Sequence, residues 1–175
     1  MSWIAKLIFI RFMGWNIVGD FPKLNKFIIA VVPHTRNLDF VVGVLVRTVL
    51  SEQINFIGKK ELFNPFTGWF FTAMGGSPIN RGTNENKVTA IAEVFNKRDY
   101  FRLAIAPEGT RKKVDRWKTG FYHISIKASV PILLVNFNYR EKKVSFLKLF
   151  YPTGDLNKDL KSMEGFFNKA MQVKS

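Results

Sequence analysis

The sequence predicts a single α/β domain in which a mixed, largely parallel sheet is flanked by helices. Short apolar runs alternate with helical patterns along most of the chain, which is the usual order of elements in such domains. The 175 residues fit one domain. A hydrophobic share of 47% beside 23% charged residues is sufficient for a packed core and argues against a disordered chain.

Residues 1–20 are predicted to be an apolar, membrane-associating segment, and residues 21–175 the folded domain. Lys6 and Arg11 interrupt the apolar run of residues 1–18, which is too short and too charged for a spanning helix of about 20 apolar residues. No small-residue cleavage site follows, as a secretory signal would require. Two interpretations stay open: a terminal helix packed on the core, or a helix that dips into one leaflet while both cations snorkel.

The elements of the domain follow in order from the apolar patterns and the turn residues between them. The apolar run KFIIAVV predicts a buried strand, and Asp39 opens the next helix as a potential cap. A Phe- and Trp-rich helix ends at two glycines. Strands are expected at 26–32, 54–58, 102–106, 131–138 and 143–149, the last two joined as a hairpin by a polar turn. Helices are expected at 39–50, 65–74, 84–96, 117–128 and 157–172.

The aromatic cluster of the second of these helices permits two interpretations. Phe66, Trp69, Phe70 and Phe71 are adjacent in the sequence. Such a cluster is expected to belong to the core. The alternative is that these rings line a tunnel for an apolar chain.

Charge and composition limit the classes of partner. Lys and Arg number 27 against 13 Asp and Glu, a formal charge of +14, which favours anionic partners such as nucleic acid, an anionic membrane surface or an acidic carrier protein. The 18 Phe and four Trp suit a membrane interface but also single-stranded nucleic acid. Because the chain has no Cys, disulfides, a cysteine nucleophile and a zinc–thiolate site are excluded. With two His, no metal site is expected.

The segment VPHTRNLDF contains the strongest candidate for chemistry. His34 lies in the loop after a predicted strand, and Asp39 follows five residues later. A carboxylate on one ring nitrogen orients an imidazole as a general base and stabilises the imidazolium that forms. The spacing permits such a dyad, but a surface histidine beside a capping aspartate would give the same pattern.

Two further segments combine flexible turns with positive charge. In GGSPINRGT, Arg81 follows a Gly-Gly turn, and its guanidinium is suited to forked hydrogen bonds with a phosphate. In APEGTRKK, Glu108 is one acid in a basic neighbourhood. Lys118 follows this segment and is a candidate phosphate contact. For each, a solvated cation beside a tight turn is the simpler alternative.

Taken in order, VPHTRNLD, SPINR, APEGTR and VPILLV resemble the four sequence blocks of the glycerolipid acyltransferases, which include bacterial lysophosphatidic acid acyltransferases. The resemblance covers residues 27–135 and implies a glycerol-phosphate acyltransferase-like fold. It implies His34 as base, Asp39 as its partner and Arg81 as a binder of the acceptor phosphate. It also implies further acceptor contacts from the Glu108, Gly109, Thr110 and Arg111 stretch. Pro33 and Ala106 depart from the residues usual at the start of the first and third blocks.

The expected reaction is transfer of a fatty acyl group from a thioester to the hydroxyl of a lysophospholipid. Acyl carrier protein or coenzyme A is the expected donor, and no cofactor is expected. The expected location is the cytoplasmic face of a membrane, in a peripheral or monotopic state. Rival hypotheses are an O-acyltransferase for another acceptor, such as an amino-acid-type lyso-lipid or a polyol, and an inactive lipid-binding relative. A basic nucleic-acid-binding module is the outside alternative, but it would not need the His34 and Glu108 blocks, so nucleic acid is not an expected partner.

Overall fold

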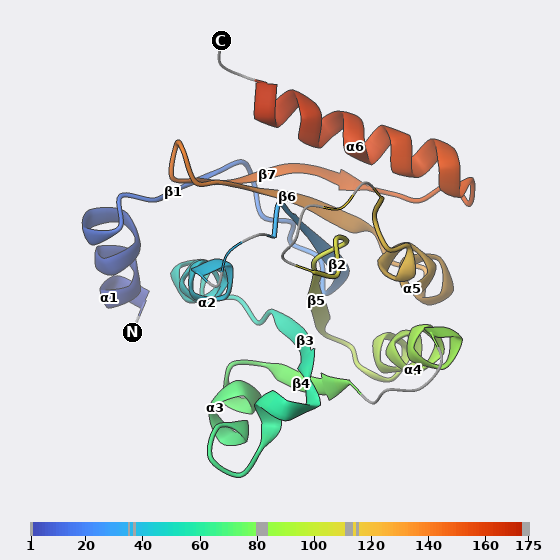
Figure 1. Cartoon of the computed structure of the whole chain (residues 1–175), viewed down its shortest axis with the longest axis horizontal. Coiled ribbons are helices and arrows are strands. Elements are labelled where there is room, and N and C mark those ends of the chain that lie inside the picture. The colour runs from blue at the N-terminus through green and yellow to red at the C-terminus, as the bar shows by residue number, and fades with distance from the viewer. Residues whose placement is uncertain are drawn as a thin grey trace.

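A computed structural model of the chain describes residues 2–34, 36, 38–79, 84–110, 114 and 116–172. A seven-stranded sheet in the order β1-β7-β6-β2-β5-β3-β4 forms the centre, with helices on both of its faces (Figure 1). All neighbouring strands are parallel except β6 and β7, which form the predicted antiparallel hairpin. The predicted α/β fold with a mixed, largely parallel sheet is therefore confirmed.

The elements have the following bounds. The strands are β1 (Asn16–Val18), β2 (Lys26–Val32), β3 (Asn55–Lys59), β4 (Gly76–Ile79), β5 (Phe101–Ile105), β6 (Ile132–Asn138) and β7 (Lys143–Phe150). The helices are α1 (Ser2–Lys6), the π-helix η1 (Leu7–Phe12), α2 (Leu38–Leu50), the 3₁₀ turn η2 (Lys60–Phe63), α3 (Gly68–Ala73), α4 (Asn84–Lys97), α5 (Gly120–Ala128) and α6 (Leu156–Gln172).

Strand β2 connects the two hydrophobic cores of the domain. Successive side chains of a strand point to opposite faces, so a continuous apolar run buries both. Phe27 and Ile29 pack toward α2 and η1, and Ile28 and Ala30 pack toward α4, α5 and α6. Helix coverage on both faces is what makes a near-parallel sheet stable in water. The central strand is thereby fixed in position at the middle of the molecule.

A buried carboxylate attaches helix α6 to the core that it shares with α4 and α5. Asp159 accepts hydrogen bonds from the hydroxyl of Tyr122 at 2.8 Å and from the backbone N–H of Thr153 at 2.6 Å. Burial alone would raise the pKa of Asp159, but these donors outweigh it and lower the pKa below its usual value. The tyrosine–aspartate contact joins α5 to α6 on the face away from α2.

The N-terminal segment packs on the core along one side, as one of its two interpretations expected, and its insertion into a leaflet stays a prediction. Ala5, Phe9 and Trp15 are buried, whereas Trp3, Leu7 and Phe12 are 68%, 44% and 77% exposed. The helical part ends at Phe12, and β1 then pairs with β7, so a continuous helix through residue 18 was a wrong expectation. No helix within the described ranges is long and apolar enough to cross a bilayer. The boundary at residue 20 stays a prediction.

The β3–β4 region differs most from its sequence-based description. Strand β4 falls in a segment that the two glycines had marked as a turn, and α3 begins at Gly68, not at residue 65. Phe71 is partly buried, but Phe66 and Trp69 are 87% and 72% exposed. The expectation that these two rings belong to the core is therefore wrong.

Parallel pairing determines where the sequence blocks meet. Strands β2, β5 and β6 run in the same direction, because β2 pairs in parallel with both of its neighbours. Their carboxyl ends lie at one edge of the sheet, the usual place for a site in an open α/β fold. The segments that follow these strands contain His34, Glu108 and Tyr139.

Candidate functional site

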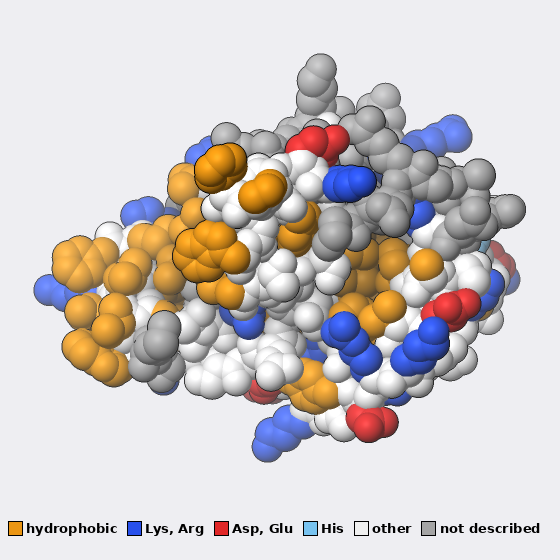
Figure 2. Space-filling view, turned by 90° about the horizontal axis from the view of Figure 1, so that it is seen from below, with side chains coloured by type: hydrophobic (Ala, Val, Ile, Leu, Met, Phe, Trp, Pro, Cys, Tyr) orange, Lys and Arg blue, Asp and Glu red, His pale blue; other side chains and the backbone are white. Residues whose placement is uncertain are grey.

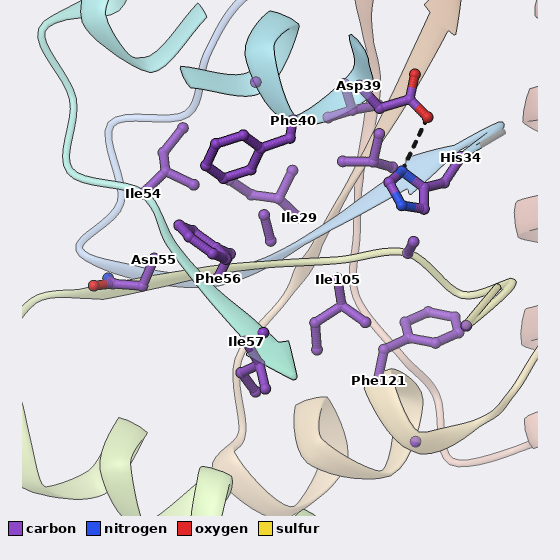
Figure 3. A pocket seen from close by; sticks show the side chains of 18 of the residues that line it. Ile29, His34, Asp39, Phe40, Ile54, Asn55, Phe56, Ile57, Ile105 and Phe121 are labelled. Carbon is purple, nitrogen blue, oxygen red and sulfur yellow. Dashed lines mark ion pairs between the residues drawn. The ribbon is translucent and has the colours of Figure 1, made fainter. Parts of the chain in front are cut away.

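His34 and Asp39 come together at the carboxyl end of β2. Nδ1 of His34 lies 3.1 Å from Oδ2 of Asp39 (Figure 3). The His34 side chain is 28% exposed and that of Asp39 is 2% exposed, so the imidazole reaches solvent and its partner does not. With Nδ1 directed at the carboxylate, Nε2 is the ring nitrogen on the side away from Asp39. This arrangement has the geometry that a general base requires.

The Asp39 carboxylate binds three donors, two from the loop after β2 and one from the end of β6. Oδ2 also accepts the backbone N–H of Arg36 at 2.9 Å, and Oδ1 accepts the hydroxyl of Tyr139 at 2.5 Å. Burial alone would raise the pKa of Asp39, but the hydrogen bonds from His34, Tyr139 and Arg36 outweigh it and lower the pKa. Asp39 is therefore an anion held toward His34, in the first turn of α2.

Tyr139 is the site residue that sequence reasoning missed. Burial, together with the hydrogen bond to Asp39, raises the pKa of its hydroxyl, so it remains a proton donor. Its ring packs edge-on against Trp15 with centroids 4.9 Å apart, and the Arg36 guanidinium lies 4.5 Å from its centroid. Because Tyr139 is 100 residues from Asp39 in the sequence, no local pattern indicated the contact.

Glu108 links the third sequence block to the first. One of its carboxylate oxygens accepts the backbone N–H of His34 at 2.7 Å. The two blocks are 74 residues apart, and the parallel pairing of β2 with β5 places them together. In this structure Glu108 therefore fixes the backbone of the loop that presents the imidazole.

Gly109 and Lys118 form a compact turn beside Glu108. The N–H of Lys118 donates to the carbonyl of Pro107 at 2.8 Å, and Gly109 has a φ of +62°. A Cβ built on Gly109 would lie 2.6 Å from Cδ of Lys118, so the lysine stem crosses directly over this glycine. A side chain at position 109 would be strained and would displace Lys118. Thr110 lines the same cleft as Gly109 and Lys118.

Arg81 and Arg111 lie outside the described residues, so the two predicted arginine contacts stay predictions. Strand β4 ends at Ile79 and runs parallel to β3, which in turn is parallel to β5. The chain therefore leaves β4 at the same edge of the sheet at which β2 and β5 end. Within the ranges that the structure describes, no group of three His, Cys, Asp or Glu side chains is arranged to hold a metal ion.

A large apolar cleft adjoins the imidazole. It has a volume of about 2050 Å³ and is lined by side chains from β2, β3, α2, α4 and α5. Strand β3 pairs with β5 at two positions, Asn55 with Leu103 and Phe56 with Ala104, and the strands separate beyond them. In Figure 3, apolar side chains surround the space and His34 lies at its edge. The labelled apolar residues of this wall are Ile29, Phe40, Ile54, Phe56, Ile57, Ile105 and Phe121.

Comparison with known protein families assigns this α/β fold, with its paired histidine and aspartate, to a class of enzymes. A family model described as Acyltransferase matches residues 17–138, which include the loops of His34 and Glu108. The chain belongs to this acyltransferase family. The resemblance that the four sequence blocks indicated is thereby confirmed.

The similar curated proteins share the name 1-acyl-sn-glycerol-3-phosphate acyltransferase. The chain is 31% identical over 127 residues to the 1-acyl-sn-glycerol-3-phosphate acyltransferases of Escherichia coli K12 and Salmonella typhimurium, which covers 69% of this chain and 51% of each relative. The protein of that name from Haemophilus influenzae is 27% identical over 153 residues, covering 82% of this chain and 61% of the relative. The chain thus spans about half the length of the first two relatives. No solved structure matches it.

Tyr139→Phe should raise the pKa of Asp39, because a donor to the carboxylate is lost. At neutral pH the free energy of unfolding should fall by about 1.5–3 kcal/mol, the usual scale for a hydrogen bond to a charged group. A lowered folded-state pKa stabilises the fold above the unfolded pKa of about 3.9, and this contribution is lost as pH falls through the folded value. The difference in unfolding free energy between wild type and variant should therefore become smaller in acid.

Carboxyl ¹³C chemical shifts followed against pH would measure this change. Tyr122→Phe is the matched control, since it removes an equivalent bond from Asp159 on the other face of the sheet. Each variant should shift the titration of its own aspartate and leave the other unchanged. An unaltered Asp39 titration in Tyr139→Phe would contradict the assigned network.

Proposed function

We propose that the chain transfers a fatty acyl group from an acyl thioester to the hydroxyl of a lysophospholipid, with lysophosphatidic acid as the favoured acceptor. Acyl carrier protein or coenzyme A carries the acyl group. The observation that carries the proposal is the His34–Asp39 pair, 3.1 Å apart, at the edge of a large apolar cleft. Family membership and the names of the similar proteins support the choice of reaction and acceptor.

His34 is the general base of the proposed mechanism. Its Nε2 removes the proton of the acceptor hydroxyl while that oxygen attacks the thioester carbonyl. The tetrahedral intermediate then collapses, the C–S bond breaks, and the imidazolium returns the proton to the departing thiolate. Asp39 holds the imidazole in the required tautomer and stabilises its charged form. The products are an ester and a thiol, and the chain has no cysteine to form an acyl-enzyme with the acyl group.

The two ends of the site suit the two halves of the reaction. The cleft walls, which include Phe40, Phe56 and Phe121, are suited to an acyl chain, because burying apolar surface is favourable. Cations suit the acceptor phosphate: Lys118 borders the cleft, and the sequence supplies Arg81 and Arg111. An apolar cavity next to a base and cations is what an acyl thioester and a phosphate-bearing alcohol together require.

A membrane surface is the proposed place of reaction, on its cytoplasmic face. The exposed apolar side chains of α1 and η1 form what we term the N-terminal apolar surface: Trp3, Ile4, Leu7, Ile8, Ile10 and Phe12. Lys6 and Arg11 lie within the same segment and suit anionic head groups. A peripheral or monotopic attachment would bring the enzyme to a lipid acceptor.

His34→Ala should lower the acyl-transfer rate by at least about 100-fold, the usual scale for loss of a general base. Asp39→Asn should give a similar or smaller loss, because the amide cannot orient the ring in the same way. Tyr151→Ser, at an exposed side chain that does not line the cleft, is the control and should stay close to wild type. Near-normal turnover by folded His34→Ala protein would rule out the mechanism.

Arg81→Ala should raise the Michaelis constant for the lysophospholipid much more than that for the acyl thioester. Arg81→Lys should recover part of the loss, since a lysine lacks the planar fork of two donors. Steady-state kinetics with each substrate varied in turn would separate the two constants. A change confined to the thioester constant would show that Arg81 belongs to the donor site.

Replacing Trp3, Leu7 and Phe12 by Ser should weaken binding to lipid vesicles. These exposed positions are preferable to a deletion, because Phe9 and Trp15 of the same segment are buried in the core. Wild-type binding should strengthen with anionic lipid, at about 1 kcal/mol per cation near the surface, and weaken with salt. An apolar remainder should persist in high salt and be smaller in the triple variant. Equal co-sedimentation of both proteins in high salt would contradict the attachment.

A further inference from the structure

A short apolar projection stands out from the domain between β3 and α3. Four of its large side chains are exposed: Leu62 at 39%, Phe66 at 87%, Trp69 at 72% and Phe70 at 42%. Single exposed apolar residues are ordinary on protein surfaces, but a contiguous aromatic patch marks an interaction site. We call residues 62–70 the aromatic projection. The N-terminal apolar surface does not include it.

Internal hydrogen bonds hold the aromatic projection in shape. The Asn64 side-chain oxygen accepts the backbone N–H groups of Phe66 at 2.9 Å and Thr67 at 3.0 Å. The Thr67 hydroxyl donates to the carbonyl of Leu62 at 2.8 Å. The most exposed ring, Phe66, is therefore presented at the tip of a defined turn.

The same bonds reduce the cost of moving this turn out of water. A polar group that enters an apolar medium without a partner is strongly penalised. Here the N–H groups at the tip already have acceptors, and the indole N–H of Trp69 donates to the carbonyl of Phe66 at 3.1 Å. Satisfied polar groups beneath exposed aromatic side chains are suited to a lipid interface.

The aromatic projection is directly connected to the wall of the cleft. Phe71, the residue after it in α3, lines the cleft, and its ring centroid lies 5.7 Å from Phe40 and 6.0 Å from Phe63. Phe40 follows Asp39 in α2 and also lines the cleft. Helix α3 thus has one side on the apolar cleft and the other in solvent.

Figure 2 shows apolar side chains in two groups on one face of the molecule, over the N-terminal helix at the left and over α3 nearer the centre. An apolar hollow lies beside the α3 group, and Lys and Arg side chains occur around these areas. The exposed Lys60 adjoins the aromatic projection. The cations of this face, in a chain of net charge +14, complement an anionic surface.

We propose that the aromatic projection inserts into the interface of an anionic lipid bilayer. With the N-terminal apolar surface it makes a second point of attachment, which holds the mouth of the cleft toward the lipid. A convex group of aromatic rings suits the deformable interfacial layer, where Trp and Phe settle readily. This proposal rests on the proposed function, because a lipid acceptor requires the mouth of the cleft to face the membrane.

Vesicle binding of the full chain tests the proposal. The probe is a vesicle of phosphatidylcholine and phosphatidylglycerol, and the variant combines Phe66→Ser with Trp69→Ser. Its apparent vesicle affinity should fall by at least about tenfold, given the apolar area removed. The matched control combines Tyr151→Ser with Met171→Ser, which removes exposed side chains from outside both apolar areas and should leave binding unchanged. Equal binding by the two double variants would overturn the proposal.

Fluorescence quenching by brominated lipids tests insertion without removing the apolar patch. Trp69→Phe keeps an aromatic ring at position 69, so binding should persist while part of the lipid-dependent quenching disappears. Quenching that is identical in Trp69→Phe and wild type would show that position 69 does not reach the bilayer. A dimer in lipid-free solution that the Phe66→Ser and Trp69→Ser changes dissociate would instead assign the patch to a second copy and overturn the proposal.

An activity comparison separates this inference from the proposed function. With a short-chain lysophosphatidic acid in free solution, the double variant should retain wild-type turnover. With the acceptor embedded in vesicles, it should lose activity in proportion to its lost binding. If wild type transfers no acyl group to any acceptor, the proposed function fails, but binding and quenching still decide whether the aromatic projection contacts lipid. Equal activity of variant and wild type on vesicles at limiting lipid would count against the second attachment point.

Discussion

The arrangement of the site depends on the buried carboxylate of Asp39. Its two oxygens receive donors from the His34 ring, the Arg36 backbone and the Tyr139 hydroxyl, which come from the loop after β2 and from the end of β6. A buried anion without such donors would carry a large desolvation penalty, so the three bonds and the local fold stabilise each other. Glu108 adds a fourth connection by binding the His34 backbone from the end of β5. Parallel pairing around β2 makes these contacts possible.

The features that the sequence predicted correctly are those that depend on residues close together in the chain. The apolar runs of β2 and β6 and the spacing of His34 and Asp39 are visible within a few residues, and the antiparallel β6–β7 hairpin follows from its polar turn. Strand β1 and strand β4 were not predicted, because each is short and depends on its partner strand for hydrogen bonds. Tyr139 was missed for a similar reason, since its contact with Asp39 exists only after β6 has packed beside β2. Phe66 and Trp69 were misplaced, because hydrophobicity alone does not distinguish a core residue from an exposed apolar one.

The cleft has an apolar part and a basic part, and the proposed acyl transfer requires both. Most of the cleft wall is apolar, whereas the turn of Gly109 and Lys118, which belongs to the same wall, is polar and basic. This contrast suits the amphiphilic acceptor and the acyl chain of the proposed reaction. The two exposed apolar areas on the face shown in Figure 2 are the surfaces that we propose to contact lipid.

Mass spectrometry of the reaction products tests the central claim most directly. The protein would be incubated with an acyl thioester of coenzyme A or of acyl carrier protein and with a panel of lyso-acceptors, including lysophosphatidic acid and an amino-acid-type lyso-lipid. We expect a diacylated phospholipid from lysophosphatidic acid, with one thiol released for each ester formed. Thioester cleavage at the same rate without any acceptor, or no diacylated phospholipid with either donor, would contradict it.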